Sequence, residues 1–367
     1  MKTSTLHKFF VTGLALAGLT LAPGARADVE VFFVGGNASQ TVLFDRATNI
    51  LSGLSVVISP TNSTVRTYTG TISSQPGLGN VTIDFAQLGA VGGLQDVVNQ
   101  NNNITATSNS LPPTVAVSST APEAVGIDPS PFVQTRTLVI PFVFVKNSVK
   151  SPNLAGVTNL TQRQAAYLEG ASGTLPSAFF GGSSTTDIVY LVARNTAAAV
   201  RTEIDANVYF TGTISTWATN QASFAVLGPP YNTTPIGSPV PDPNGGQANG
   251  AGVRAQVNAI TNSIGTVAAQ DISTLTPLAY EGVPFSITNV ETGSYPIWGY
   301  ERWAYLKNGQ QGAPSANQLA VINTLLAAVT NATYQTTSPI FTGNFGRLSL
   351  LQVERSSDGG PITSLLY

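Results

Sequence analysis

Near its start the chain reads Val31-Phe32-Phe33-Val34-Gly35-Gly36-Asn37-Ala38-Ser39, and over 39–51 apolar residues recur at helical spacing. The alternation over 30–34 predicts a strand, the two glycines predict a turn, and the spacing behind them predicts a helix. A strand, a glycine turn and a helix in direct succession are typical of an α/β fold. We therefore expect parallel strands connected by helices.

The rest of the chain continues this alternation of elements. The run over 138–145 is continuously apolar, which is typical of a buried central strand. The Pro-, Gly- and Asn-rich stretch over 228–252 predicts a surface excursion. Further strands are predicted over 65–72, 114–117, 187–193 and 264–268, and helices over 161–168, 196–205, 252–262 and 317–330. These elements predict an α/β fold with largely parallel sheets, and a chain of this length predicts two lobes.

The first 27 residues have the features of an export signal. Lys2 and Lys8 supply positive charge before an apolar run over 9–21, and Ala25-Arg26-Ala27 forms a small-residue cleavage pattern. We expect a signal peptide over 1–27 and a mature chain of about 340 residues. No later apolar stretch is long enough to span a membrane, and the chain has no cysteine for lipid attachment. A periplasmic or secreted protein is therefore expected.

The residue types that remain after the leader favour binding over catalysis. The chain has no cysteine, and its one histidine is His7, inside the leader. Ser-His-Asp and Cys-His catalysis and Cys/His metal sites are thereby excluded. Carboxylates, hydroxyls, arginines and backbone amides remain, and no paired-acid motif supports an enzyme. We expect no enzymatic activity, no metal and no cofactor.

Charge is sparse in this chain. Charged residues make up 9% of it, against roughly 25% in ordinary domains. Loss of the leader removes three of the 16 basic residues and leaves 13 against 18 acidic ones, a net charge of −5. No basic stripe is present, which argues against nucleic acid or an anionic membrane surface as a partner.

Four short polar loops follow predicted strands, over 35–40, 73–75, 118–120 and 194–199. Ligands of open α/β sheets bind beyond the carboxyl ends of the strands, where helix N-termini offer unpaired amides to an anion. Arg194 follows a strongly apolar strand and could supply a bidentate grip on such an anion. The alternative is a structural arginine paired with Asp187 or Glu203. Arg201, one helical turn further on, either reaches the same cleft or faces solvent.

The order of these landmarks resembles the periplasmic phosphate-binding proteins, the substrate receptors of phosphate ABC transporters. The resemblance covers nearly the whole mature chain, although each motif is weak alone. It rests on the opening strand and turn quoted above and on the apolar strand over 138–145 with the helix and turn behind it at 158–170. It rests further on Tyr68-Thr69-Gly70-Thr71-Ile72-Ser73-Ser74, Ser119-Thr120-Ala121-Pro122, Ile188-Val189-Tyr190-Leu191-Val192-Ala193-Arg194, Ile264-Gly265-Thr266-Val267 and Tyr295-Pro296-Ile297.

The resemblance implies a two-lobed type II periplasmic binding protein fold, each lobe a mixed, mostly parallel sheet flanked by helices, with the ligand cleft between the lobes. Lobe one would comprise 28–135 and 276–367, and lobe two 136–275. The implied ligand is phosphate or a related oxyanion, with an ABC permease as partner and a monomeric receptor. The implied ligand-binding residues are Ala38, Ser39, Ser73, Ser74, Ser119, Thr120, Arg194, Thr196, Ala198 and Ala199.

Two departures from the family pattern keep an alternative open. The family follows its arginine with Ser-Gly-Thr, whereas this chain has Asn195-Thr196-Ala197. Thr120 replaces the family's aspartate. That aspartate accepts the proton of hydrogen phosphate and so rejects fully ionised sulfate, and a threonine does not discriminate between the two ions in the same way. The alternative is a binding-protein fold with a degenerate site that serves as a structural or surface interaction protein.

The remaining candidates have structural interpretations. Asp271 and Glu281 are expected to be hinge or surface acids. The aromatic cluster Trp298, Tyr300, Trp303 and Tyr305 could stack a ligand ring, but packing against lobe one is the favoured interpretation.

Overall fold

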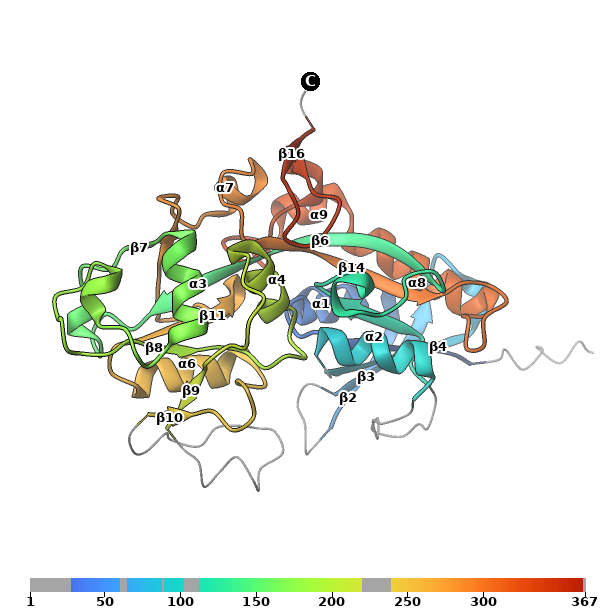
Figure 1. Cartoon of the computed structure of the whole chain (residues 1–367). Helices are drawn as coiled ribbons and strands as arrows, with labels where there is room; N and C mark the ends of the chain where they lie inside the picture. Colours follow the sequence, from blue (N-terminus) through green and yellow to red (C-terminus); the bar gives the residue numbers. More distant parts are fainter. Residues whose placement is uncertain (1–27, 60–64, 88, 102–111, 220–238, 366–367) are drawn as a thin grey trace, which may run out of the picture.

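The computed structural model describes residues 28–59, 65–87, 89–101, 112–219 and 239–365 (Figure 1). The predicted leader lies outside the described residues, and so does the first part of the predicted excursion, 228–238. Among the described residues, no helix has both the length and the apolar character that crossing a bilayer requires.

One mixed sheet of ten strands runs through the molecule. Its strands in spatial order are β2 (Leu51–Ile58), β3 (Arg66–Ile72), β4 (Asn80–Gln87), β1 (Val29–Gly35), β5 (Val115–Ser118), β14 (Trp298–Leu306), β6 (Phe132–Lys146), β11 (Ser263–Ala268) and β8 (Tyr190–Val192), and β12 (Thr276–Pro277) pairs with β6. The parallel pairs are β1–β4, β1–β5 and β8–β11. The β2–β3 and β3–β4 pairs and the neighbours of β14 and β6 are antiparallel.

Strand β6 joins the two halves of the sheet (Figure 1). Its residues from Phe132 to Pro141 pair with β14, and those from Phe142 to Lys146 pair with β11. At 15 residues it is about 50 Å long, enough to belong to both halves. We expected each lobe to have its own sheet, and the length of β6 explains why the structure has one. The predicted apolar run over 138–145 is buried throughout, as expected of a central strand.

Helices cover both faces of the half that contains β1. Val31 and Phe33 of β1 share a core with α1 (Gln40–Ile50) and α8 (Ala316–Val329). Phe32 and Val34 point to the other face and share a core with α2 (Ala90–Asn99). This alternation along one strand is the pattern of a sheet covered on both sides.

The other half carries α3 (Gln162–Ala171), α4 (Ala199–Val208) and α6 (Gly250–Ala259) around β8 and β11. We call the half with β2, β3, β4, β1 and β5 lobe one and the half with β8 and β11 lobe two. The residue boundaries inferred from the sequence remain a proposal, because β6 belongs to both halves. The remaining described elements are α7 (Ile287–Glu291), α9 (Ala332–Thr337) and the pairs β7 (Asn159–Leu160)–β13 (Ala279–Tyr280), β9 (Trp217–Ala218)–β10 (Val240–Pro241) and β15 (Val353–Glu354)–β16 (Thr363–Ser364).

Most predicted elements are present, and several differ from the predicted ranges by two or three residues at an end. The strand predicted over 187–193 is only Tyr190–Val192, and the helix predicted over 196–205 begins three residues later, at Ala199. A turn closed by the Ala198 N–H and the Asn195 carbonyl (3.1 Å) delays that helix. Thr161 caps α3 through a capping box with Gln164. The aromatic cluster packs in and beside β14, with Trp298, Tyr300 and Trp303 buried, which confirms the structural interpretation.

Candidate functional site

A small cavity lies between the two lobes. It has a volume of about 20 Å³, room for a water molecule. Both lobes contribute to its wall. The lining residues are Gly36, Asn37, Ala38, Gly89, Ala90 and Ser119 from lobe one and Arg194, Ala198, Ala199, Val200 and Ala268 from lobe two.

Three helices begin at this cavity: α1 and α2 in lobe one and α4 in lobe two. Their N-cap residues are Ser39, Gly89 and Ala198, and none of them caps its helix through a side chain. No acidic residue lies in the first turn of any of the three. Because the first amides of a helix have no intrahelical partner and the dipole is positive there, the wall favours a negative charge.

Arg194 is the only charged residue in the described lining of this cavity. It is 4% exposed, and its guanidinium donates to the carbonyls of Gln247 (3.1 Å, from Nε) and Ala248 (2.8 Å, from Nη2). Burial lowers its pKa to about 10, and the charge of Asp271 opposes this shift. At that pKa Arg194 is still charged at neutral pH.

Arg194 has no ion pair among the described residues. The predicted pairing with Asp187 or Glu203 is therefore wrong, while the contacts with two carbonyls give Arg194 a structural role as well. Asp187 accepts from the Asn153 side chain (2.6 Å) instead, and Asp271 is paired with Arg254 (2.9 Å). A buried cation without a counter-charge is costly, and an anion in the cavity would supply that counter-charge.

Five of the predicted ligand-binding residues line the cavity: Ala38, Ser119, Arg194, Ala198 and Ala199. Ser39 is buried behind the wall, where its hydroxyl donates to the Glu301 carboxyl. Burial raises the pKa of Glu301 well above its ordinary value, although the charge of Arg302 opposes this. This shift favours the uncharged form of the Glu301 carboxyl.

Ser73, Ser74 and Thr196 are not brought to the cavity. Strand β3 is antiparallel to β4, so its end at Ile72 lies beside Asn80, at the start of β4, whereas the cavity lies beyond the ends of the parallel strands. Ser73 and Ser74 are therefore exposed at the opposite edge of the sheet. Thr196 is exposed in the turn before α4. The strand-end pattern located these loops but did not give the direction of β3.

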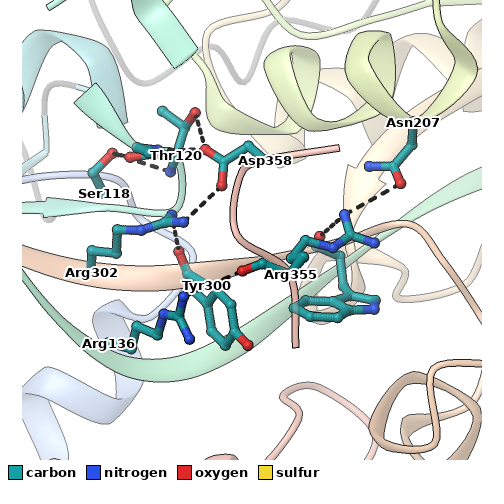
Figure 2. Close-up of polar contacts among 10 residues, drawn as sticks. Ser118, Thr120, Arg136, Asn207, Tyr300, Arg302, Arg355 and Asp358 are labelled. Atoms are coloured by element: carbon teal, nitrogen blue, oxygen red, sulfur yellow. Dashed lines mark hydrogen bonds and ion pairs between the residues drawn. The ribbon is translucent and has the colours of Figure 1, made fainter. Parts of the chain in front are cut away.

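Thr120 lies next to the cavity lining and binds a partner that the sequence did not suggest (Figure 2). Its hydroxyl donates to Asp358 Oδ2 (2.9 Å), and the Ala121 N–H donates to the same oxygen. Arg302 Nη2 donates to Asp358 Oδ1 (2.8 Å), and this ion pair is almost fully buried. The carboxylate that Thr120 binds therefore belongs to the C-terminal segment of the chain.

Two more buried charges surround Asp358. Arg355 is 1% exposed; its guanidinium donates to the carbonyls of Trp298 (3.0 Å) and Pro296 (2.6 Å) and lies 4.2 Å from the centre of the Trp298 ring. Glu203, on α4, is fully buried, and its pKa is raised well above the ordinary value by burial and then by the charge of Asp358. The sequence contains one indication of this cluster: three charged residues lie close together at 354–358 in a chain that has few charges.

The other flagged charges have local partners. Arg201 neither lines the cavity nor faces solvent freely: it donates to the Gly245 carbonyl (2.8 Å) and lies 3.7 Å from Asp205. Glu281 accepts from the Gln162 N–H at the start of α3.

The topology and the interlobe cavity define a two-lobed α/β fold of the type II periplasmic binding protein class. The structure is similar to that of a Clostridium perfringens protein assigned as a phosphate ABC transporter substrate-binding protein, solved with bound phosphate. The two chains are 13% identical, 84% of this chain and 95% of that chain are covered, and the TM-score is 0.52. At this identity the likeness shows the fold.

Two further solved structures score lower. An ABC-type phosphate transport receptor from Vibrio cholerae is 11% identical, with 81% of this chain and 93% of that chain covered and a TM-score of 0.47. The regulatory domain of CcmR from Synechocystis, in complex with 2-PG, is 13% identical, with 83% and 98% covered and a TM-score of 0.42. No family model and no curated protein sequence matches the chain.

Proposed function

We propose that this protein is an extracytoplasmic solute-binding protein that captures phosphate or a related oxyanion between its two lobes. Arg194 and the N-termini of α1, α2 and α4 form the site. Delivery of the captured ion to an ABC permease is the role that the fold and the predicted leader favour. Binding, release and lobe movement account for this role without any catalytic step.

The observation that carries the proposal is the state of Arg194. Its guanidinium is buried, charged and without an ion pair among the described residues, and it lies at a cavity where three helices begin. A bound oxyanion would accept from the guanidinium and from amides at the helix starts, and would supply a counter-charge for Arg194. Each such charge-assisted hydrogen bond contributes about 1.5–3 kcal/mol.

The lining also bears on which oxyanion is bound. Arg194 and the helix amides can only donate, the Ser119 hydroxyl and the Asn37 side chain can donate or accept, and no carboxylate lies in the described lining. A hydrogen-bearing oxyanion needs an acceptor for its proton, whereas a fully ionised one does not. We therefore expect sulfate to compete with phosphate more effectively than it would at a site with a lining carboxylate.

Because both lobes line the cavity, we expect ligand entry to separate them. The lobes are connected through β6 and β14, and contacts across the cleft include the Val91 N–H and the Ala197 carbonyl (3.4 Å). Closure around a ligand between two lobes is an established mode of hinge motion.

The test is the substitution Arg194→Met, with phosphate and sulfate affinity measured by calorimetry on protein that has been unfolded and refolded to remove retained ligand. Loss of two charge-assisted hydrogen bonds predicts affinity reduced by roughly 100-fold or more. Arg163→Met is the matched control, since Arg163 is exposed on α3, away from the cavity. Unchanged affinity in Arg194→Met would place the site elsewhere.

The contacts that close the cleft favour a second candidate. Asp358, Arg355 and Glu203 lie buried where the lobes meet, and such contacts would also suit a scaffold whose lobes do not open. A structural or surface interaction protein of this kind would bind no small oxyanion, and the same calorimetry separates the two functions.

A further inference from the structure

The C-terminal segment 355–360 lies where the two lobes meet and contacts both (Figure 2). On the side of lobe one, Asp358 is bound by Thr120, Ala121 and Arg302. On the side of lobe two, Gly359 packs against α4 so closely that a Cβ added to it would lie 2.3 Å from the Ala206 Cβ. Arg355 lies 3.4 Å from the Asn207 Oδ1 on the same helix. The segment therefore spans the junction.

The groups that bind Asp358 are held in place by other parts of the fold. The Ser118 hydroxyl donates to the Thr120 carbonyl (2.7 Å) and accepts from the Thr120 N–H (3.2 Å), which fixes the loop after β5. Arg302 lies on β14 opposite Ser118, and its Nη1 donates to the Tyr300 carbonyl (3.1 Å). A hydroxyl, an amide and a guanidinium thus converge on one point without help from the C-terminal segment.

These three donors match a carboxylate. Arg302 binds one oxygen of Asp358, while Thr120 and the Ala121 N–H bind the other. Arg302 is 7% exposed and Thr120 is fully buried, so an anion there is shielded from water. Charge-assisted hydrogen bonds in such surroundings are the strong ones.

We propose that Thr120, the Ala121 amide and Arg302 form a second anion site, selective for a carboxylate, and that Asp358 is its tethered ligand. The C-terminal segment is then a displaceable strap across the junction of the lobes. The site is separate from the Arg194 cavity and stands whether or not that cavity binds an oxyanion. Because a tethered group acts at a high effective concentration, a free carboxylate binds only when Asp358 is removed.

The test is chemical rescue of Asp358→Ala by sodium formate, with sodium chloride at matched ionic strength as the reference. The melting temperature of the variant should fall by several degrees, because Arg302 loses its buried partner. Formate should restore it in a saturable manner, with no comparable effect on the wild type. Glu354→Ala is the control: Glu354 is an exposed carboxylate in the same segment, and its loss should cause neither the fall nor the rescue.

The double variant Asp358→Ala/Arg302→Met locates the effect, since it should lose the response to formate. If Asp358→Ala does not fold in chloride, its refolding yield in formate against chloride gives the same comparison. A formate effect equal in wild type and variant, or absent from both melting temperature and refolding yield, would overturn the proposal.

Discussion

A group of buried titratable residues lies where the two lobes meet. Charged residues make up only 9% of the chain, yet Arg194, Arg302, Arg355, Glu203 and Glu301 are all buried around the junction. Charged side chains are seldom buried unless they are paired, and Arg194 has no ion pair among the described residues. The residues most costly to bury therefore mark the region where function is expected.

Glu203 makes stability depend on pH. Burial, and then the charge of Asp358, raises its pKa well above 4.5, while Arg355 and Arg302 oppose the shift. Between 4.5 and the raised value the folded protein holds one proton more than the unfolded chain, so the free energy of unfolding falls as pH rises. Glu203→Gln should remove a slope of about 1.4 kcal/mol per pH unit, seen by urea unfolding as the pH is raised above about 5.

The control for this prediction is Glu123→Gln, which removes an exposed carboxylate. It should leave the pH dependence of the wild type unchanged. A slope in Glu203→Gln equal to that of the wild type would mean that Glu203 ionises in the folded protein as it does in the unfolded chain.

At the scale of elements, the Glu203 side chain of α4 packs against Gly299 of β14. Gly299 of β14 has no side chain, and a Cβ added there would lie 2.6 Å from Glu203 Oε1 and 2.9 Å from the Ser119 carbonyl oxygen. Only a glycine lets α4 approach this closely. The same approach brings the start of α4 and Arg194 to the cavity.

Gly299→Ala should therefore push α4 away from β14. We expect a loss of about 1–3 kcal/mol in the free energy of unfolding, typical of overpacking. Hydrogen exchange should rise in α4 and in the segment 355–360 more than elsewhere. Gly77→Ala is the matched control, since nothing lies within 4 Å of the added Cβ. Unchanged exchange in α4 would show that this contact does not hold the lobes.

The elements also show what the sequence could and could not predict. Strands and helices with a clear period, such as β1, α1, α3 and α8, were predicted nearly to their ends. Strand β14 was not predicted, because its residues are buried on both faces and show no alternation. Strand β2 was missed because it begins at Leu51, directly where the predicted helix ends.

The site was predictable where it is local in sequence. Arg194 and the loops after β1 and β5 follow strands, and the structure places them at one cavity. Ser73 and Ser74 were misplaced because periodicity does not give strand direction. Asp358 was missed because it lies 238 residues from Thr120, and no local pattern connects positions so distant.

At the scale of the whole molecule, two lobes share one sheet and are joined by three connections: β6, β14 and the segment 355–360. The first two are strands of that sheet, whereas the third consists of contacts made by the residues of the segment. Opening of the cleft therefore requires bending at β6 and β14 and release of contacts across the junction. An oxyanion that bridges Arg194 and the helices of lobe one would stabilise the closed arrangement.

The most direct test of the account is thermal unfolding of the wild-type protein, unfolded and refolded first, titrated with phosphate and with sulfate. At 100 times its Kd, a ligand that binds only the folded protein should add about 2.7 kcal/mol to the free energy of unfolding. We predict a saturable rise in melting temperature with one or both ions, absent from Arg194→Met and retained in Arg163→Met. No rise with either ion in the refolded wild type would contradict the proposed function.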